Sequence, residues 1–224
     1  MKFDPRTIII LKNFAMMNPS LQFKAGSILH TRSAPNKAVI AKAKIKDVIP
    51  CDFAIYDVAR FISVMSLFDN PDLKFGDKFI TISSDGRSAR YALTSPAMIV
   101  TPPDREINMK DPDVVFSLSQ EILTSIQKAL AVMSLPEIVI SSDGKSAIKL
   151  EAIKSNESSS DLFSIDVGHS EKVFKAIFLP ENWKFLPGSY NVELMFRGFA
   201  RFSTDEVEYY VPVEKDSELG VNNE

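Results

Sequence analysis

The stretch Arg6-Thr-Ile-Ile-Ile-Leu-Lys-Asn-Phe-Ala-Met-Met17 carries the clearest helical pattern in the chain. At 100° per residue, apolar side chains such as Ile10 and Phe14 fall on one wide arc, and Lys12 and Asn13 fall on the other side. The pattern predicts a helix over residues 6–17 that buries one face and exposes a thin polar one.

The sequence that follows this helix predicts strands and one more helix. A second helical pattern runs from about Tyr56 to Phe68 and ends at Asp69-Asn70-Pro71, because a proline disfavours helix in the residue before it. Asp85-Gly86 lies between two alternating runs, which is a strong hairpin signal. Strands are predicted at residues 21–23, 27–32, 38–45, 78–83 and 87–93.

The second half repeats this order of elements. Residues 101–113 are polar and rich in proline, which indicates a connector and places the domains at residues 1–108 and 109–224. Ser119 is the expected cap of a helix that reaches about Ser134, and residues 180–185 allow only a short helix. Further strands are predicted at 114–118, 137–142, 145–153, 162–167, 173–179, 190–197, 199–203 and 206–213. The fold class is therefore α+β, with two similar domains of antiparallel sheets and helices.

The supply of reactive residues excludes several classes of enzyme and site. No two glycines lie closer than ten positions, so neither a Walker loop nor a G-x-G-x-x-G or G-x-S-x-G motif is present. His30 and His169 lie far apart, and Cys51 is the single cysteine, so we expect no metal site, no disulfide and no cofactor. We expect Cys51 to be a small buried residue.

The chain also lacks signals for a membrane or for export. The longest apolar run, Ala129 to Met133, is five residues, whereas a membrane-spanning helix needs roughly 20. Met1-Lys2-Phe3-Asp4-Pro5 does not resemble the start of a secretory signal peptide. We therefore expect a soluble, cytoplasmic protein.

Charge is distributed unevenly along the chain. Residues 1–60 contain ten basic and four acidic residues, although the whole chain has a formal net charge of -3. Residues 205–224 carry seven acidic residues against Lys215 alone. This polarity fits a protein that presents one basic surface to a polyanion, and an unevenly decorated solvated surface is the alternative.

Three segments together resemble the DNA sliding clamps, specifically the trimeric processivity clamps of T-even-type phages. They are Thr7-Ile-Ile-Ile-Leu-Lys-Asn-Phe-Ala15, the stretch from Ala54 to Leu67, and Ile99-Val-Thr-Pro102. The resemblance implies a ring of six similar domains from three chains, with helices lining a hole and sheets outside. It also implies a non-enzymatic function, in which the ring encircles duplex DNA, tethers the replicative DNA polymerase and is loaded by a separate ATPase clamp loader.

The resemblance also assigns candidate site residues. Polar groups on the helices and near them would face the DNA: Lys2, Arg6, Lys12, Asn13, Arg60, Gln127, Lys128 and Lys184. A groove between the connector and the last strand would take hydrophobic peptides from partners: Ile99, Val100, Pro102, Pro103, Val211, Pro212 and Val213. Subunits would meet through a strand near Leu162–Val167 and an edge strand near Met98–Thr101, with Met98, Leu162, Ile165 and Val167 at the interface.

Simpler interpretations remain for each of these sets. Each helix could present an ordinary solvated face, and the connector and last strand could belong to the core. Lys42, Lys44 and Lys46 alternate along one strand and so share one face, which we expect to be an outer, solvated face rather than a DNA contact. Two other functions also remain: a non-enzymatic single-stranded-DNA-binding or scaffold protein of replication, which needs exposed aromatic side chains, and a hydrolase built on scattered carboxylates.

Overall fold

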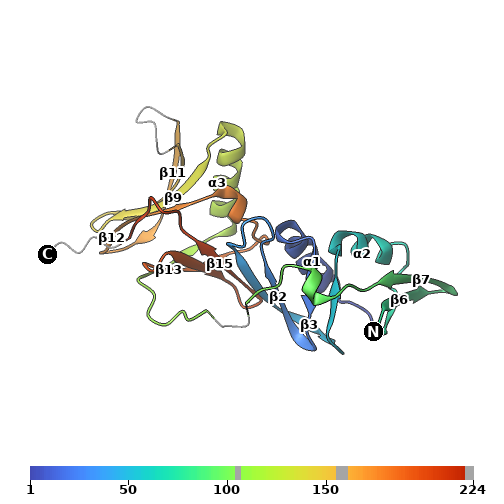
Figure 1. Ribbon diagram of the computed structural model, residues 1–224. Coiled ribbons are helices and arrows are strands. Elements are labelled where there is room, and N and C mark those ends of the chain that lie inside the picture. The colour runs from blue at the N-terminus through green and yellow to red at the C-terminus, as the bar shows by residue number, and fades with distance from the viewer. Residues whose placement is uncertain (104–106, 155–160, 220–224) are drawn as a thin grey trace. The chain divides into compact units, whose positions relative to one another are not determined.

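The chain divides into two compact units, residues 1–106 and 107–224 (Figure 1). The computed structural model describes residues 1–103, 107–154 and 161–219. Each unit contains antiparallel strands in two groups, one helix of 13 or 14 residues and shorter helical segments. The division falls close to the predicted boundary between residues 108 and 109.

Two helices of the first unit begin at aspartate caps. Helix α1 (Pro5–Met17) starts where the Asp4 carboxylate accepts a hydrogen bond from the Arg6 amide at 2.8 Å. Helix α2 (Val58–Met65) starts where the Asp57 carboxylate accepts from the Arg60 amide, also at 2.8 Å. A carboxylate satisfies an otherwise unpaired amide and is favoured at the positive end of a helix, so both starts are encoded locally.

The strands of the first unit form two antiparallel groups. One has the order β4-β1-β2-β3 and the other β5-β6-β7. A 3₁₀ turn, η1, follows them at Pro96–Met98. The strands are β1 (Leu21–Phe23), β2 (Gly26–Arg32), β3 (Ile40–Ile49), β4 (Phe53–Ile55), β5 (Asp72–Phe75), β6 (Phe79–Ser84) and β7 (Arg87–Ala92).

Helices α1 and α2 lie side by side, and α1 packs against β2 and β3 (Figure 1). Ala41, Ala43 and Ile45 of β3 are buried, whereas Lys44 and Lys46 are exposed. Because side chains alternate along a strand, the lysines lie on the face that points away from these buried residues. Full burial of an isoleucine side chain stabilises a fold by about 1.5–3 kcal/mol, so the burial of Ile45 favours the arrangement in which this face of β3 is covered.

The second unit has the same kinds of elements. Helix α3 (Gln120–Met133) contacts β10 and β11, and a short 3₁₀ turn, η2, spans Pro180–Asn182. The strands have the orders β15-β14-β13-β8 and β11-β10-β9-β12-β16. They are β8 (Val114–Leu118), β9 (Glu137–Asp143), β10 (Ala147–Ile153), β11 (Leu162–His169), β12 (Val173–Phe178), β13 (Tyr190–Met195), β14 (Phe199–Ser203), β15 (Val207–Pro212) and β16 (Glu218–Leu219).

Aromatic packing stabilises the second unit around Phe185. The centroid of its ring lies 5.5 Å from the ring centroids of Trp183 and Tyr190, and 4.7 Å and 4.9 Å from those of Phe202 and Tyr209. The Tyr209 hydroxyl accepts a hydrogen bond from the Leu186 amide at 3.1 Å. The segment after η2 is therefore part of the core.

Many of the predicted elements are confirmed. Ser119 caps α3 by accepting a hydrogen bond from the Ile122 amide at 3.3 Å. The predicted turn at Asp85-Gly86 lies in the hairpin β6–β7, and Asp143-Gly144 lies in the hairpin β9–β10. The α+β fold class, with antiparallel sheets, is also confirmed.

Other predictions need correction. The expected edge strand near Met98–Thr101 is not a strand, because η1 starts at Pro96 and the prolines at 102 and 103 have no amide hydrogen to donate. The expected helix over residues 180–185 is confined to η2. Cys51 is exposed rather than buried, because it lies in the turn between β3 and β4. In the part of the chain that the structure describes, no helix has both the length and the apolar character needed to cross a membrane.

Candidate nucleic-acid interface

The exposed residues of α1 are spaced three or four positions apart and form a stripe along one side of the helix. Pro5, Ile9, Lys12 and Met16 are its exposed residues. Asp4 lies just before the first residue of the helix, and the helix itself contains no aspartate or glutamate. The stripe therefore presents the positive charge of Lys12 with no carboxylate of α1 to balance it.

The outward surface of α2 has the same character. Arg60 and Ser63 are exposed, and no acidic residue lies within the helix. The Ser63 hydroxyl donates to the Ala59 carbonyl at 2.9 Å, so its hydrogen is used within its own helix. Arg60 is thus the main donor that α2 offers to an anion.

The three other predicted DNA-facing residues of the first unit differ in exposure. Lys2 is exposed, and Arg6 is half-buried at the first turn of α1. Asn13 is only 3 % exposed, because it lies on the side of α1 that packs into the unit. The expectation that Asn13 faces DNA is therefore corrected. Lys12, the next residue toward the N-terminus, is exposed at the surface of α1.

Helix α3 presents a more neutral surface. Gln127 and Lys128 are exposed, as predicted, but Glu121 is exposed in the first turn. The hydroxyl of Ser119 holds the pKa of Glu121 below its ordinary value. The exposed Thr124 hydroxyl donates to the Gln120 carbonyl at 2.8 Å. The exposed side-chain amides of Gln120 and Gln127 and the ammonium of Lys128 are donors that suit a phosphate.

Gln127 also links α3 to the segment after η2. Its Nε2 donates to the Trp183 carbonyl at 3.5 Å. Lys184 follows Trp183 directly and is half-buried. Within the second unit, the structure therefore brings Gln127 and the backbone next to Lys184 together, although the two lie far apart in the sequence.

These surfaces suit weak, sequence-independent contact with a polyanion. Lysine and arginine bind phosphate oxygens without reading bases, and such contacts weaken as salt concentration rises. Nothing in the three helices combines several donors around one point, as a phosphate-binding loop does. The helices can attract a DNA backbone but have no feature that would hold it in one register.

The first part of the connector is attached to the end of α1. The Asn18 side chain donates through Nδ2 to the Val100 carbonyl at 2.9 Å, and its Oδ1 accepts from the Ser20 amide at 3.0 Å. Ile99, Val100 and Pro102 are half-buried, and Pro103 is exposed. This half of the predicted groove is thus fixed to the first unit by one buried asparagine.

The other predicted groove residues lie at the end of β15. Val211 is 0 % exposed and belongs to the core of the second unit, because its side chain points to the same face as the buried Tyr209. Pro212 and Val213 are half-buried, and the Val213 amide donates to the Gly198 carbonyl at 3.0 Å. Only Pro212 and Val213 are placed to offer apolar surface, and the expected contribution of Val211 is corrected.

The predicted interface residues all reach the surface to some extent. Met98 is 70 % exposed in η1, Leu162 is exposed, and Ile165 and Val167 are half-buried in β11. The sequence patterns missed the role of β7 as the edge of the first unit's second sheet.

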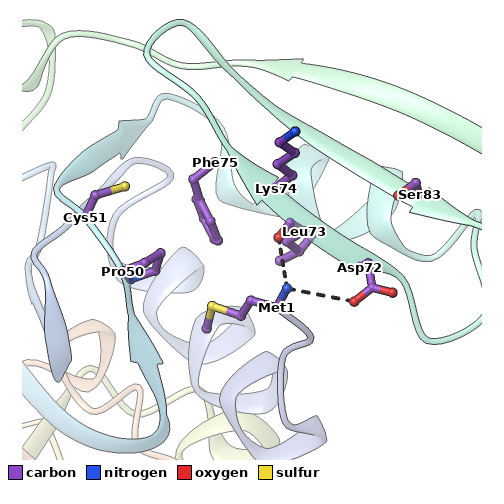
Figure 2. A pocket seen from close by; sticks show the side chains of 8 residues that line it. All are labelled: Met1, Pro50, Cys51, Asp72, Leu73, Lys74, Phe75 and Ser83. Atoms are coloured by element: carbon purple, nitrogen blue, oxygen red, sulfur yellow. Dashed lines mark hydrogen bonds and ion pairs between the residues drawn. The ribbon is translucent and has the colours of Figure 1, made fainter.

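A pocket of about 610 Å³ lies beside β5 (Figure 2). The Met1 amine donates to the Leu73 carbonyl at 3.1 Å and lies 3.8 Å from the Asp72 carboxylate. The Leu73 amide donates back to the Met1 carbonyl at 2.6 Å, so Met1 extends the edge of β5. The lining is Met1, Pro50, Cys51, Asp72, Leu73, Lys74, Phe75 and Ser83.

Among residues 1–103, 107–154 and 161–219, no group of three or more histidine, cysteine, aspartate or glutamate residues could hold a metal ion.

Comparison with known proteins identifies the family. Residues 2–95 match the family described as DNA polymerase processivity factor, and residues 115–215 match the family described as gp45 sliding clamp, C terminal. The sliding clamp of Vibrio phage KVP40 is 34 % identical over 220 residues, which cover 96 % of this chain and 99 % of that protein. The chain belongs to the sliding clamp family.

Solved sliding clamps show the same fold at low sequence identity. Proliferating cellular nuclear antigen from Entamoeba histolytica superimposes with a TM-score of 0.68 at 13 % identity, over 95 % of this chain and 97 % of that one. The corresponding antigen from A. fulgidus, bound to the C-terminal region of FEN-1, gives 0.66 at 15 % identity over 94 % and 96 %. The clamp fold thus extends over both units, and the chain is a phage-type DNA polymerase processivity factor.

Proposed function

We propose that three copies of the chain close into a ring that encircles duplex DNA, with α1, α2 and α3 on the inner surface. The observation that carries this proposal is the exposed faces of α1 and α2, which present Lys12 and Arg60 and contain no acidic residue. In a closed ring, DNA is retained because it is enclosed. Weak and salt-screened contacts are then sufficient, and they allow the ring to slide.

The DNA-facing set in this proposal keeps the predicted residues that are exposed or half-buried. It consists of Lys2, Arg6, Lys12, Arg60, Gln127, Lys128 and Lys184 and omits the buried Asn13. The overall charge of -3 is compatible with it, because positive charge on the inner surface and negative charge elsewhere would direct DNA into the hole.

The proposed ring uses its outer surface for partners. The proposed peptide-binding residues, which would receive a short hydrophobic segment of the DNA polymerase or of the clamp loader, are Ile99, Val100, Pro102 and Pro103 in the first unit and Pro212 and Val213 in the second. The A. fulgidus structure, in which a clamp-fold protein is bound to the C-terminal region of FEN-1, supports this mode of binding. The chain lacks a nucleotide-binding loop, so a separate ATPase would load the ring.

The proposed role is not catalytic. It requires no metal and no cofactor, and it places the protein in the cytoplasm of the infected bacterial host. The alternative, a single-stranded-DNA-binding or scaffold protein, is not favoured, because such proteins stack bases on exposed aromatic side chains. Tyr56 and Phe79 are the large exposed aromatic residues among those that the structure describes, and Arg90 lies over the Phe79 ring.

Absolute mass measured by light scattering over a wide concentration range tests the assembly. We expect a species near 75 kDa, which is three chains of 25.0 kDa. With the clamp loader and ATP, the ring should remain on nicked circular DNA and leave linear DNA with free ends. A strict monomer at every concentration, or equal retention on both DNAs, would contradict the ring.

A further inference from the structure

Strands β7 and β11 are edge strands with complementary charges. Strand β7 is the last strand in the order β5-β6-β7, and β11 is the first in the order β11-β10-β9-β12-β16. Each pairs through one side with its neighbour, β6 or β10, over six or seven residue pairs. An edge of this length offers a row of backbone donors and acceptors to another strand.

Strand β7 carries positive charge and no acidic residue. Arg90 is exposed, and its guanidinium carbon lies 4.7 Å from the centroid of the Phe79 ring. Phe79 pairs with Ala92 in the register, so this cation–π contact holds Arg90 on the outer face of the small sheet, opposite the face where Tyr91 contacts Phe61. The nearest acidic residue in the sequence, Asp85, lies in the hairpin turn.

Strand β11 carries negative charge and no lysine or arginine. Leu162, Ser164 and Asp166 are exposed on one face, and they alternate with the half-buried Phe163, Ile165 and Val167. This second row shares a face with the buried Leu150 and Ala152, because Ile165 pairs with Leu150 and Phe163 with Ala152. Asp166 therefore lies on the outer face of its sheet.

The neighbouring strand supplies the other charges near Asp166. Lys149 of β10 pairs with Asp166 in the register, and Glu151 of β10 accepts a hydrogen bond from the Ser164 hydroxyl at 3.1 Å. Lys149 is positive, and Asp166 and Glu151 are negative, so these three side chains together leave the outer face at β11 with a net negative charge.

We infer that charge on these two edges directs head-to-tail pairing of subunits, with Arg90 of one chain facing Asp166 of the next. The inference rests on the proposed ring and specifies how its boundaries are encoded. If β7 and β11 pair edge to edge, the outer face of one sheet continues into the outer face of the other, so Arg90 and Asp166 lie on the same side of the joined sheet. In a register that brings Arg90 opposite or diagonal to Asp166, the long arginine side chain reaches the carboxylate.

The same charges disfavour the wrong pairings. Two β7 edges would bring Arg90 against Arg90, and two β11 edges would bring Asp166 against Asp166, which repel at close range. Such like-to-like contacts would make a two-fold dimer with free ends, whereas contact between unlike edges can close into a ring. The half-buried row of Phe163, Ile165 and Val167 supplies apolar area for the contact, and the ion pair supplies its direction.

Charge reversal at the two positions tests the inference on the full-length chain. Arg90→Asp alone and Asp166→Arg alone should each raise the dissociation constant of the ring about tenfold or more at low salt, because each places like charges at every boundary. The effect should shrink in 1 M NaCl, where screening is strong. Lys145→Asp, an exposed change in the turn between β9 and β10, is the matched control and should leave the dissociation constant unchanged.

The double variant Arg90→Asp/Asp166→Arg distinguishes charge from folding defects. Its edges are again complementary, so it should recover the mass of the wild-type ring. It should also fail to exchange subunits with isotope-labelled wild type in native mass spectrometry, because each mixed boundary brings like charges together. Full assembly of both single variants at low salt, or free mixing of the double variant with wild type, would overturn the charge inference while leaving the ring intact. A monomeric wild-type chain would instead overturn the ring and the inference with it.

Discussion

The Tyr91 hydroxyl donates a hydrogen bond to the Asp57 carbonyl at 2.7 Å, which ties the edge strand β7 to the start of α2. Burial and then the nearby Asp57 carboxylate raise the pKa of Tyr91, so the hydroxyl stays protonated as a donor. Asp57 also caps α2 through its side chain. One residue thus links a helix on the proposed DNA-facing surface to a strand at the proposed subunit boundary.

Removing this hydroxyl should weaken the first unit. We expect Tyr91→Phe to lower the free energy of unfolding by about 1 kcal/mol, because the Asp57 carbonyl loses its partner while the ring contact with Phe61 remains. Urea unfolding followed by fluorescence measures the change. Tyr56→Phe is the control, because Tyr56 is 65 % exposed. Equal effects of the two changes would show that the bond contributes nothing.

Reversing charge on the helices should shorten retention on DNA. Lys12→Glu with Arg60→Glu should reduce the lifetime of loaded rings on nicked circular DNA several-fold and reduce its salt dependence, because two phosphate contacts per chain are lost. The mass of the ring should not change. Lys44→Glu with Lys145→Glu alters net charge equally at exposed positions on β3 and in the β9–β10 turn. If that pair shortens retention as much, net charge rather than the helix surface controls it.

The peptide site can be tested at its half-buried residues. Ile99→Ser with Val213→Ser should weaken the tightest-binding peptide among overlapping segments of the cognate polymerase by about tenfold or more, since each lost apolar side chain contributes about 1–2 kcal/mol when covered. Fluorescence anisotropy measures the affinity. Val48→Ser, at an exposed position of β3, should leave it unchanged. Undiminished binding by a folded double variant would place the site elsewhere.

Two hairpin glycines allow a matched test of crowding. Gly86 and Gly144 both adopt positive φ, at 76° and 73°. A Cβ on Gly144 would lie 2.7 Å from the Glu171 carbonyl oxygen, whereas nothing lies within 4 Å of one on Gly86. Gly86→Ala should cost about 1 kcal/mol from backbone strain alone. Gly144→Ala should cost clearly more in chemical denaturation, and equal costs would mean that the neighbouring loop moves freely.

The turn that contains Gly144 should also respond to acid. Hydrogen bonds from the Ser146 and Lys145 amides and the Ser146 hydroxyl lower the pKa of Asp143 to about 2. Because the folded-state pKa lies below the unfolded value, the stabilisation is present above about pH 4 and is lost as pH falls toward 2. Asp143→Asn should flatten the pH dependence of unfolding across that window. An unchanged profile between pH 2 and 5 would remove Asp143 as a contributor.

The sequence by itself determined the elements whose signals are local. The predicted Ser119 cap and the predicted turn at Asp85-Gly86 act through neighbouring residues, so their positions can be read from the chain. The aspartate caps at Asp4 and Asp57, which we did not predict, are signals of the same local kind. The helical period of α1 and the alternation of β3 also follow from local geometry, and they correctly placed Lys12 and Lys44 at the surface.

Only the tertiary structure decided how these elements are used. Asn13 lies next to Lys12 but is buried, because the side of α1 that packs into the unit is wider than the arc of its apolar residues. Val211 points into a core built from strands far apart in the sequence, and the edge positions of β7 and β11 depend on which strands pair. Burial and strand order are set by long-range contacts, and a short window of sequence does not contain the residues that make them.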